Sequence, residues 1–203
     1  MSAPTFRRIN GLVCLDTRDP RMRRLRRAGH VAEIHGNRLW NSSFLLMDYL
    51  KRHPLPAGTR VLELGCGRGL LGLFCAKRFG ARVHGIDADP NVLPYLQLHA
   101  EVNGLTMTAE RRTFDRLTRA FLGEFDLILG ADICFWDDLS RQLRNLIRRA
   151  RRGGAGRVMI ADPGRPPFHA LAEHCMARLD GVQRLEMRLR RPVRATGELL
   201  IVD

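Results

Sequence analysis

"VLELGCGRGL", from Val61 to Leu70, is the stretch that decides the fold. A short apolar run ends in a turn that holds Gly65, Gly67 and Gly69, and an apolar helical pattern follows over residues 70–80. A strand that enters a helix through a glycine-rich turn is typical of a βα unit, and such a turn often holds a cofactor. The stretch therefore predicts the first unit of a parallel sheet together with a cofactor loop.

From residue 59 onward the chain alternates short apolar runs with longer helical patterns, which predicts an α/β fold. We expect strands over residues 60–65, 81–87, 106–114, 125–132 and 157–162, and helices over 39–53, 70–80, 90–104, 138–154 and 166–179. For the helix over 39–53, Ser42 or Ser43 is the expected N-cap. Residues 182–190 and 198–203 read as two further strands joined by a loop. The prediction is a doubly wound, mostly parallel seven-stranded sheet with a terminal antiparallel hairpin.

The composition fits one globular domain of 203 residues with an excess of positive charge. The formal net charge is +13, and residues 1–38 contain nine arginines and three acids. Such a balance favours acidic partners, although a solvated arginine surplus is an equal alternative. We expect a basic N-terminal arm over residues 1–38 and one domain over 39–203.

The five cysteines are widely spaced, the seven histidines have no metal-ligand spacing, and no apolar run is long enough to span a membrane. The N-terminus also lacks the apolar segment of a secretory signal. These features predict reduced thiols, no metal site and a cytoplasmic protein.

The glycine turn fits two kinds of cofactor. Gly67-x-Gly69-x-x-Gly72 matches the dinucleotide fingerprint. Glu63, however, lies on the strand just before the turn, and a carboxylate there disfavours a pyrophosphate. A ligand with an amino group suits this acid better. Asp87, at the end of the second strand, stands where an acid would bind ribose hydroxyls.

Glu63-x-Gly65-x-Gly67-x-Gly69 resembles motif I of class I S-adenosylmethionine methyltransferases. The resemblance implies a Rossmann-like methyltransferase fold with S-adenosyl-L-methionine as cofactor. Trp40 matches the tryptophan of the entry helix that lies by the cofactor in the lysine-modifying group of this family, and Phe114 takes the place of an aromatic residue after the third strand. The cofactor-binding residues implied are Trp40, Glu63, Gly65, Gly67, Asp87, Phe114 and Ala131.

"ADICFWDDL", from Ala131 to Leu139, reports on the substrate. It resembles the D-x-x-[Y/F] motif of seven-β-strand protein lysine methyltransferases, whereas amide and exocyclic-amine methyltransferases carry [N/D]-P-P-[Y/F] at this place. "ADPGRPPF", from residue 161 to 168, is similar to a stretch in the methyltransferases of the electron-transfer flavoprotein β-subunit. The resemblance implies Asp132 and Phe135 as catalytic residues, with Trp136 and Arg165 as substrate contacts.

The expected function is therefore S-adenosylmethionine-dependent N-methylation of a lysine in a protein. We expect the N-terminal arm and the arginine face of the 138–152 helix to attract an acidic surface of that protein substrate. Three alternatives stay open: an RNA methyltransferase, a small-molecule N-methyltransferase, and a cofactor-binding interaction protein without turnover. Charge supports the RNA alternative, but few aromatic residues lie near the arginines for base stacking. The oligomeric state is not predicted.

Overall fold

The computed structural model describes residues 4–33, 36 and 38–203, and its centre is a seven-stranded sheet in the order β5-β4-β3-β6-β7-β9-β8. Neighbouring strands from β5 to β7 are parallel, and β9 runs antiparallel to both β7 and β8. The predicted sheet and terminal hairpin are confirmed. The strands are β3 (Arg60–Leu64), β4 (Arg82–Asp87), β5 (Thr108–Arg111), β6 (Leu127–Ala131), β7 (Arg157–Asp162), β8 (Val182–Leu189) and β9 (Ala195–Val202).

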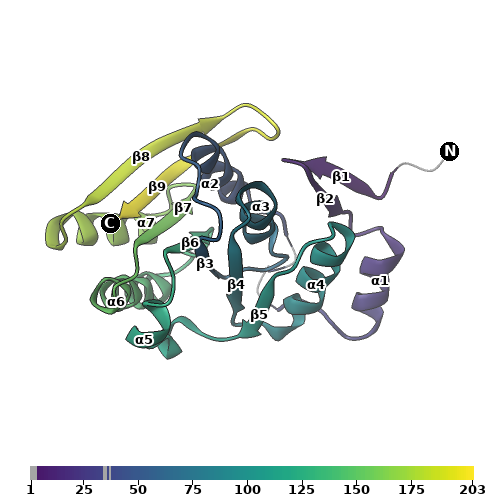
Figure 1. Cartoon of the computed structure of the whole chain (residues 1–203), viewed down its shortest axis with the longest axis horizontal. Helices are drawn as coiled ribbons and strands as arrows, with labels where there is room; N and C mark the ends of the chain where they lie inside the picture. Colours follow the sequence, from purple (N-terminus) through teal and green to yellow (C-terminus); the bar gives the residue numbers. More distant parts are fainter. Residues whose placement is uncertain (1–3, 34–35, 37) are drawn as a thin grey trace.

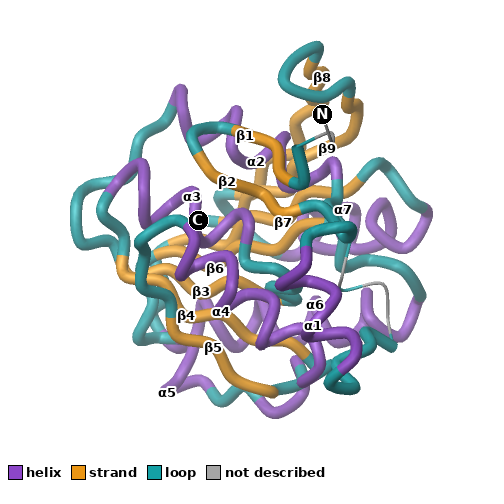
Figure 2. The backbone as a smooth tube through the Cα atoms, turned by 90° about the vertical axis from the view of Figure 1, so that its right-hand side faces the viewer, coloured by secondary structure: helices purple, strands orange, loops and turns teal. Residues whose placement is uncertain are grey.

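Helices cover both faces of the sheet (Figures 1 and 2). One face carries α2 (Asn41–Arg52), α3 (Leu70–Phe79) and α4 (Leu93–Val102), which follows the short helix η1 (Pro90–Val92). The other carries α5 (Arg119–Leu122), α6 (Asp137–Gly153) and α7 (Pro166–Arg178). Strand residues alternate between the two layers: Val61 packs with the α2–α3 side, and Leu62 packs with the α6–α7 side. This alternation follows from the two-residue period of a strand and explains the continuous apolar runs of the sequence.

The sheet register places the ends of three strands side by side. Leu64 of β3 pairs with Ile86 of β4 and with Gly130 of β6. Gly65, Asp87 and Ala131, which come next along their strands, therefore meet at the carboxyl edge. From β3 the chain builds β4 and β5 on one side of β3, and it then crosses back to place β6 on the other side. A crevice opens where the strand order reverses in this way, and ligands bind at such crevices in open α/β sheets.

The weak third strand is shorter than expected. The sequence suggested a strand over residues 106–114, but β5 ends at Arg111 and Phe114 begins the short helix η2 (Phe114–Arg116). The chain turns here toward the cavity described below, so Phe114 reaches it from a turn and not from a strand.

Part of the predicted basic arm is packed against the domain. Residues 6–15 form a hairpin of β1 (Phe6–Ile9) and β2 (Leu12–Leu15), and α1 (Pro20–Arg27) follows (Figure 1). The turn is Asn10-Gly11, with φ of 50° and 82°. Leu15 and Met22 pack with Tyr95 of α4. Residues 1–3, 34, 35 and 37 of the arm lie outside the described residues, and the boundary at residue 38 stays a prediction.

A buried histidine joins this N-terminal part to α4. The Leu15 N–H donates to Nε2 of His99 at 3.2 Å, and Nδ1 of the same ring lies 2.7 Å from the Tyr95 carbonyl. Both contacts require the neutral ring with its proton on Nδ1. Burial disfavours the imidazolium, with Arg68 adding to the effect, and lowers the pKa of His99 to about 4.

We expect His99 to make the fold sensitive to acid. Its folded pKa lies below the ordinary 6.5, so the unfolded chain takes up the proton first as pH falls, and stability is lost between about pH 6.5 and pH 4. The loss amounts to at most about 3 kcal/mol. Urea unfolding of wild type and His99→Gln across this range should show the difference between them shrinking toward pH 4. A constant difference would contradict the assignment.

Candidate cofactor and substrate site

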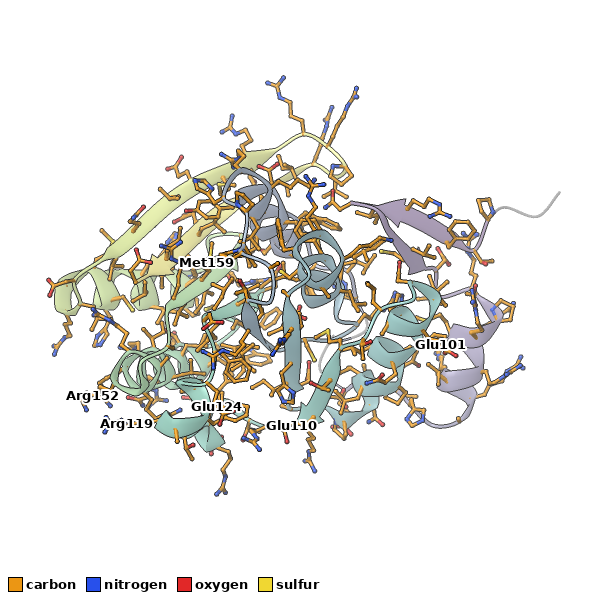
Figure 3. All side chains as sticks on the ribbon, viewed as in Figure 1. Glu101, Glu110, Arg119, Glu124, Arg152 and Met159 are labelled. Atoms are coloured by element: carbon orange, nitrogen blue, oxygen red, sulfur yellow. The ribbon has the colours of Figure 1, made fainter. Side chains whose placement is uncertain are left out.

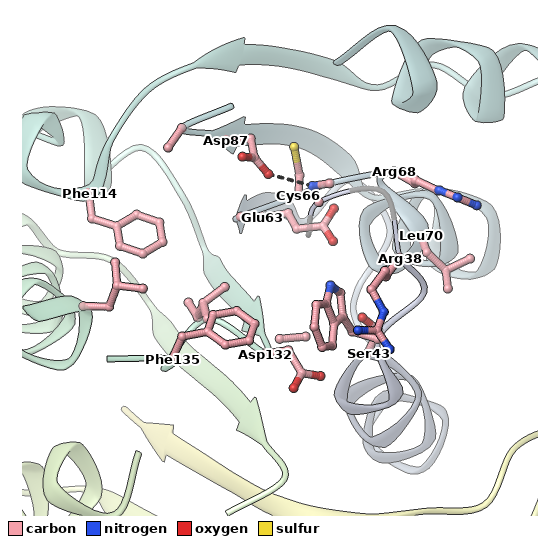
Figure 4. Close-up of a pocket in the computed structure, with 18 of the residues that line it drawn as sticks. Arg38, Ser43, Glu63, Cys66, Arg68, Leu70, Asp87, Phe114, Asp132 and Phe135 are labelled. Atoms are coloured by element: carbon pink, nitrogen blue, oxygen red, sulfur yellow. Dashed lines mark hydrogen bonds between the residues drawn. The ribbon is translucent and has the colours of Figure 1, made fainter. Parts of the chain in front are cut away.

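A cavity of about 270 Å³ lies at the carboxyl edge of the sheet, over the crevice between β3, β4 and β6 (Figure 4). Most of the residues singled out from the sequence line it. These are Trp40, Glu63, Gly65, Gly67, Asp87, Phe114, Ala131, Asp132, Phe135 and Trp136. Arg165 is not in the lining but contacts Asp132 from behind. Residues from five separate stretches of sequence thus meet around one space.

The glycine turn has both the conformation and the tight fit that exclude a side chain. Gly65, Gly67 and Gly69 have φ of 61°, 48° and 72°, in the left-handed region that favours glycine. A Cβ on Gly67 would lie 2.7 Å from the carbonyl oxygen of Gly36. The segment before α2 therefore closes over the turn and forms one wall of the cavity.

Glu63 is buried and held by the helix that follows the turn. Its Oε2 accepts the N–H of Gly72 at 3.0 Å, in the first turn of α3. A Cβ on Gly72 would lie 2.6 Å from the same oxygen, so Gly72 is needed for this contact. Burial, with nearby Asp87 as a smaller cause, raises the pKa of Glu63 to about 8. A cation in the cavity would favour the ionised form.

Asp87 ends β4 and faces the cavity from the next strand. Its Oδ2 accepts the N–H of Gly67 at 2.9 Å, the contact drawn in Figure 4, and its Oδ1 accepts the N–H of Asp89 at 3.0 Å. Burial raises the pKa of this carboxyl. The acid and the glycine turn are thereby fixed relative to each other.

Aromatic rings form the opposite wall. The Phe135 ring lies 5.3 Å from that of Trp40 in an edge-to-face arrangement and 5.5 Å from that of Trp136. The side chain of Trp136 is 54% exposed at the rim. Phe114 faces the cavity from η2, whereas its neighbour Asp115 is exposed and outside the lining.

Asp132 is buried and does two structural tasks. It has φ of 56°, an unusual value for a residue other than glycine. Its Oδ2 accepts the N–H of Ser42 at 3.1 Å, and its Oδ1 lies 2.9 Å from Arg165 Nη2. The prediction of Ser42 or Ser43 as N-cap was wrong: α2 begins at Asn41, no side chain of Trp40 caps it, and Asp132 binds the free N–H from a distant part of the chain.

Arg165 is held between two carboxylates and a ring. Its Nη1 lies 2.7 Å from Asp162 Oδ2, and the guanidinium lies 4.5 Å from the centre of the Phe135 ring. Asp162 Oδ1 also accepts the backbone N–H groups of Gly164 and Arg165. Asp162 is fully buried, and burial raises the pKa of its carboxyl. With both acids ionised, the cluster Asp132–Arg165–Asp162 carries one net negative charge behind the cavity.

Several lining residues were not foreseen from the sequence. Gly36, Arg38 and Leu39 precede α2, while Leu139 and Gln142 lie on the first turns of α6. The signal for the second pair was present, because a helix that starts beside a strand end directs its first turns to the same edge. No local pattern marks the first group.

The sequence also predicted reduced thiols, no metal site and no membrane-spanning segment. Among the residues that the structure describes, no group of three or more His, Cys, Asp or Glu side chains is placed to hold a metal ion. All five cysteines are buried and free. Within that same part of the chain, no helix has the length and apolar character needed to cross a bilayer.

The sheet order, the glycine turn and the acid at the end of β4 are those of the Rossmann-like class I methyltransferase fold, and the chain resembles S-adenosylmethionine-dependent methyltransferases. Residues 61–154 match the family model described as a methyltransferase domain. Two solved structures share the fold. A methyltransferase from Pyrococcus furiosus aligns with a TM-score of 0.63 at 17% identity, covering 91% of this chain and 96% of that one. The METTL16 methyltransferase domain aligns with a TM-score of 0.62 at 16% identity, covering 97% and 85%.

Sequence relatives point to two substrate classes. The ubiquinone biosynthesis O-methyltransferase of Cereibacter sphaeroides is 45% identical over 82 residues, which is 39% of this chain and 32% of that protein. The electron transfer flavoprotein beta subunit lysine methyltransferase of Rattus norvegicus is 31% identical over 134 residues, 64% of this chain and 50% of that protein. The chain thus spans about a third to a half of these relatives, and it resembles the lysine-modifying group over the longer stretch.

Gly67→Ala should destabilise the protein by more than the left-handed backbone conformation at this position explains. Gly80, at the end of α3, has φ of 66° and nothing within 4 Å of an added Cβ, so Gly80→Ala is a matched control. In both variants the free energy of unfolding should fall by about 1–2 kcal/mol, because alanine disfavours the left-handed backbone. We expect urea unfolding to show a larger loss of stability for Gly67→Ala, because its Cβ meets the carbonyl of Gly36. Equal losses would show that the segment around Gly36 does not close on the turn.

Proposed function

We propose that this protein is an S-adenosyl-L-methionine-dependent methyltransferase that N-methylates a lysine side chain of a protein with an acidic surface. The observation that carries the proposal is the carboxylate of Asp132 at the cavity, backed by Asp162 and flanked by aromatic rings. This arrangement suits a cationic side chain entering from solvent.

The cofactor part rests on the fit between the cavity and a cationic nucleoside. When bound, S-adenosyl-L-methionine supplies an electrophilic methyl group on a positively charged sulfur. Buried Glu63 has no ion pair with a cation among the described residues, and a ligand ammonium would supply one. Asp87 has the position to accept ribose hydroxyls, as acids at this strand end do. Phe114 and Ala131 provide apolar walls.

The substrate part rests on what a lysine amine needs. Its ordinary pKa of about 10.4 leaves roughly one molecule in 10³ neutral at pH 7. Asp132 attracts the ammonium and can hold the amine once neutral, but a carboxylate also raises the pKa of the amine. Burial of the amine inside the cavity would offset this effect, because desolvation disfavours the charged form. Arg165 covers one face of Phe135, which makes Trp136 the more accessible ring for a cation–π contact.

Small-molecule O-methyl transfer is the second candidate, because the ubiquinone O-methyltransferases match locally at 45% identity. Removing the proton from a hydroxyl usually requires a general base such as histidine. The cavity lining within the described chain contains no His, Lys or Tyr, so the task would fall to Asp132 or Glu63. The pair of carboxylates behind Phe135 suits an amine better than a phenol.

Asp132→Asn should lower methyl transfer to protein by roughly 10²-fold while cofactor affinity changes by less than about twofold. Asparagine can still accept the N–H of Ser42 but carries no charge to attract the amine. The assay follows transfer from radiolabelled S-adenosylmethionine into a cell extract, split between protease and nuclease treatment. Asp138→Asn, an exposed acid on α6 paired with Arg141, is the matched control and should retain activity.

Protease-sensitive label that depends on Asp132 supports the proposal and supplies the substrate for mass spectrometry. Nuclease-sensitive label would replace it with RNA methylation. Label in small molecules alone would favour the second candidate, and cofactor binding without any transfer would favour an interaction protein.

Cofactor affinity should rise with pH between about pH 6 and pH 8. Glu63 is largely protonated in this range in the ligand-free protein, and a cationic ligand favours the carboxylate, so binding releases a proton. The slope approaches tenfold per pH unit at most. Calorimetry in two buffers would measure both affinity and proton release. Glu63→Gln keeps an acceptor for the Gly72 N–H and should bind with no such slope; an unchanged slope would place the titrating group elsewhere.

A further inference from the structure

A second hollow, lined mainly by arginines, lies between α6 and α7, away from the cavity. It has a volume of about 520 Å³. Two helices that are separate in sequence supply its basic residues. Arg144, Arg148, Arg151 and Arg152 come from α6, and His174 and Arg178 come from α7. Cys175 and Leu179 add apolar surface. We refer to this hollow as the arginine groove.

The arginines of the groove lack the ion pairs that the protein makes elsewhere. Elsewhere on the surface several arginines pair with an acid, as in Asp126–Arg60, Asp48–Arg52 and Asp203–Arg157. In the groove, by contrast, none of the five guanidinium groups has a carboxylate within ion-pair distance in the part of the chain that is described. Such a concentration of like charge in a hollow is unfavourable until an anion enters.

Two side chains in the groove show the effect of this concentrated positive charge. The Nε of Arg144 is buried with no hydrogen-bond partner among the described residues. The pKa of His174 is lowered by burial, with Arg144, Arg178 and Arg148 adding to the effect. Part of the charge is explained by the C-terminal ends of the helices, which favour cations. That explanation applies to the last turn, and Arg144 and Arg148 lie earlier on α6.

Helix α6 runs from the cavity to the arginine groove. Helix α6 begins at Asp137 beside Trp136, which lines the cavity, and ends at Gly153 near the start of β7. At 1.5 Å per residue, Arg148 lies about 16 Å along the axis from Asp137. Figure 3 shows Arg152 at the outer edge of the molecule, beside Arg119. An extended segment of about five residues covers this distance, so one partner can contact the groove while another part of it reaches the cavity.

We propose that the arginine groove is a docking site for an acidic polypeptide segment, distinct from the site of methyl transfer. Arginine pairs with carboxylates through its planar fork of donors. Arg144, Arg148 and Arg151 follow one another at helical spacing, which suits glutamates repeated along one side of a segment. The described lining contains no Phe, Tyr or Trp, and single-stranded nucleic acid usually requires such rings for base stacking.

The test measures binding directly and does not depend on any methyl transfer. The probe is a fluorescent poly-glutamate peptide, titrated at low salt with the whole protein. Arg148→Glu/Arg152→Glu reverses two exposed charges in the groove and should weaken binding by about tenfold or more, since two attractive pairs are lost and the new glutamates repel the probe. Arg23→Glu/Arg27→Glu on α1 makes the same charge change at the same helical spacing and should weaken it by less than about twofold.

Three results would overturn the proposal. Equal weakening by both variants would mean that only net charge matters. An undetectable interaction with the wild-type protein would mean that the groove holds no acidic segment. Tighter binding of a short RNA duplex than of the peptide, lost in the groove variant, would make it a nucleic-acid surface. Thermal unfolding of both variants, with wild-type midpoints, establishes that the comparison concerns folded proteins.

Discussion

Carboxylates that are buried or half-buried at the carboxyl edge of the sheet are the constraint on which the rest of the site depends. Four strands contribute one each: Glu63 from β3, Asp87 from β4, Asp132 just after β6, and Asp162 from β7. An ionised carboxylate in such a place is costly unless hydrogen bonds or cations compensate it. Every one of the four accepts at least one backbone N–H group, and the donors belong to Gly72, Gly67, Ser42 and the Gly164–Arg165 pair.

These contacts determine where the neighbouring segments lie. The bond from Ser42 to Asp132 fixes the start of α2, and the bond from Gly72 to Glu63 fixes the first turn of α3. The backbone supplies only partial positive charge, however, and Arg165 is the one full cation that pairs with any of the four acids in the described chain. The cavity therefore retains an attraction for cations, although the formal net charge of the protein is +13. A cationic cofactor and a cationic side chain suit the interior, and acidic surfaces suit the exterior.

The sequence predicted the sheet, its terminal hairpin and ten of the 23 residues that line the cavity, because those features follow from local patterns. Strand ends in a parallel sheet share one edge, so residues just after each apolar run had to meet. A local signal was also overlooked: Asn10-Gly11 between two apolar runs is a strong hairpin signal, and Asp19-Pro20 marks a helix start, yet the arginine count suggested a mere arm. The wrong N-cap has a different origin. Asp132 reaches Ser42 across ninety positions in the sequence, and no local pattern encodes such a contact.

The same contact limits how Asp132 can act. Both of its oxygens already have partners, Ser42 on one side and Arg165 on the other. These two donors fix the position of the carboxylate at the edge of the cavity. Its remaining lone pairs can still accept from an amine that enters the cavity. In the lysine methylation proposed above, Asp132 would act as a fixed negative charge that orients the nucleophile, and the proton of the substrate ammonium would leave by way of solvent at the exposed rim beside Trp136.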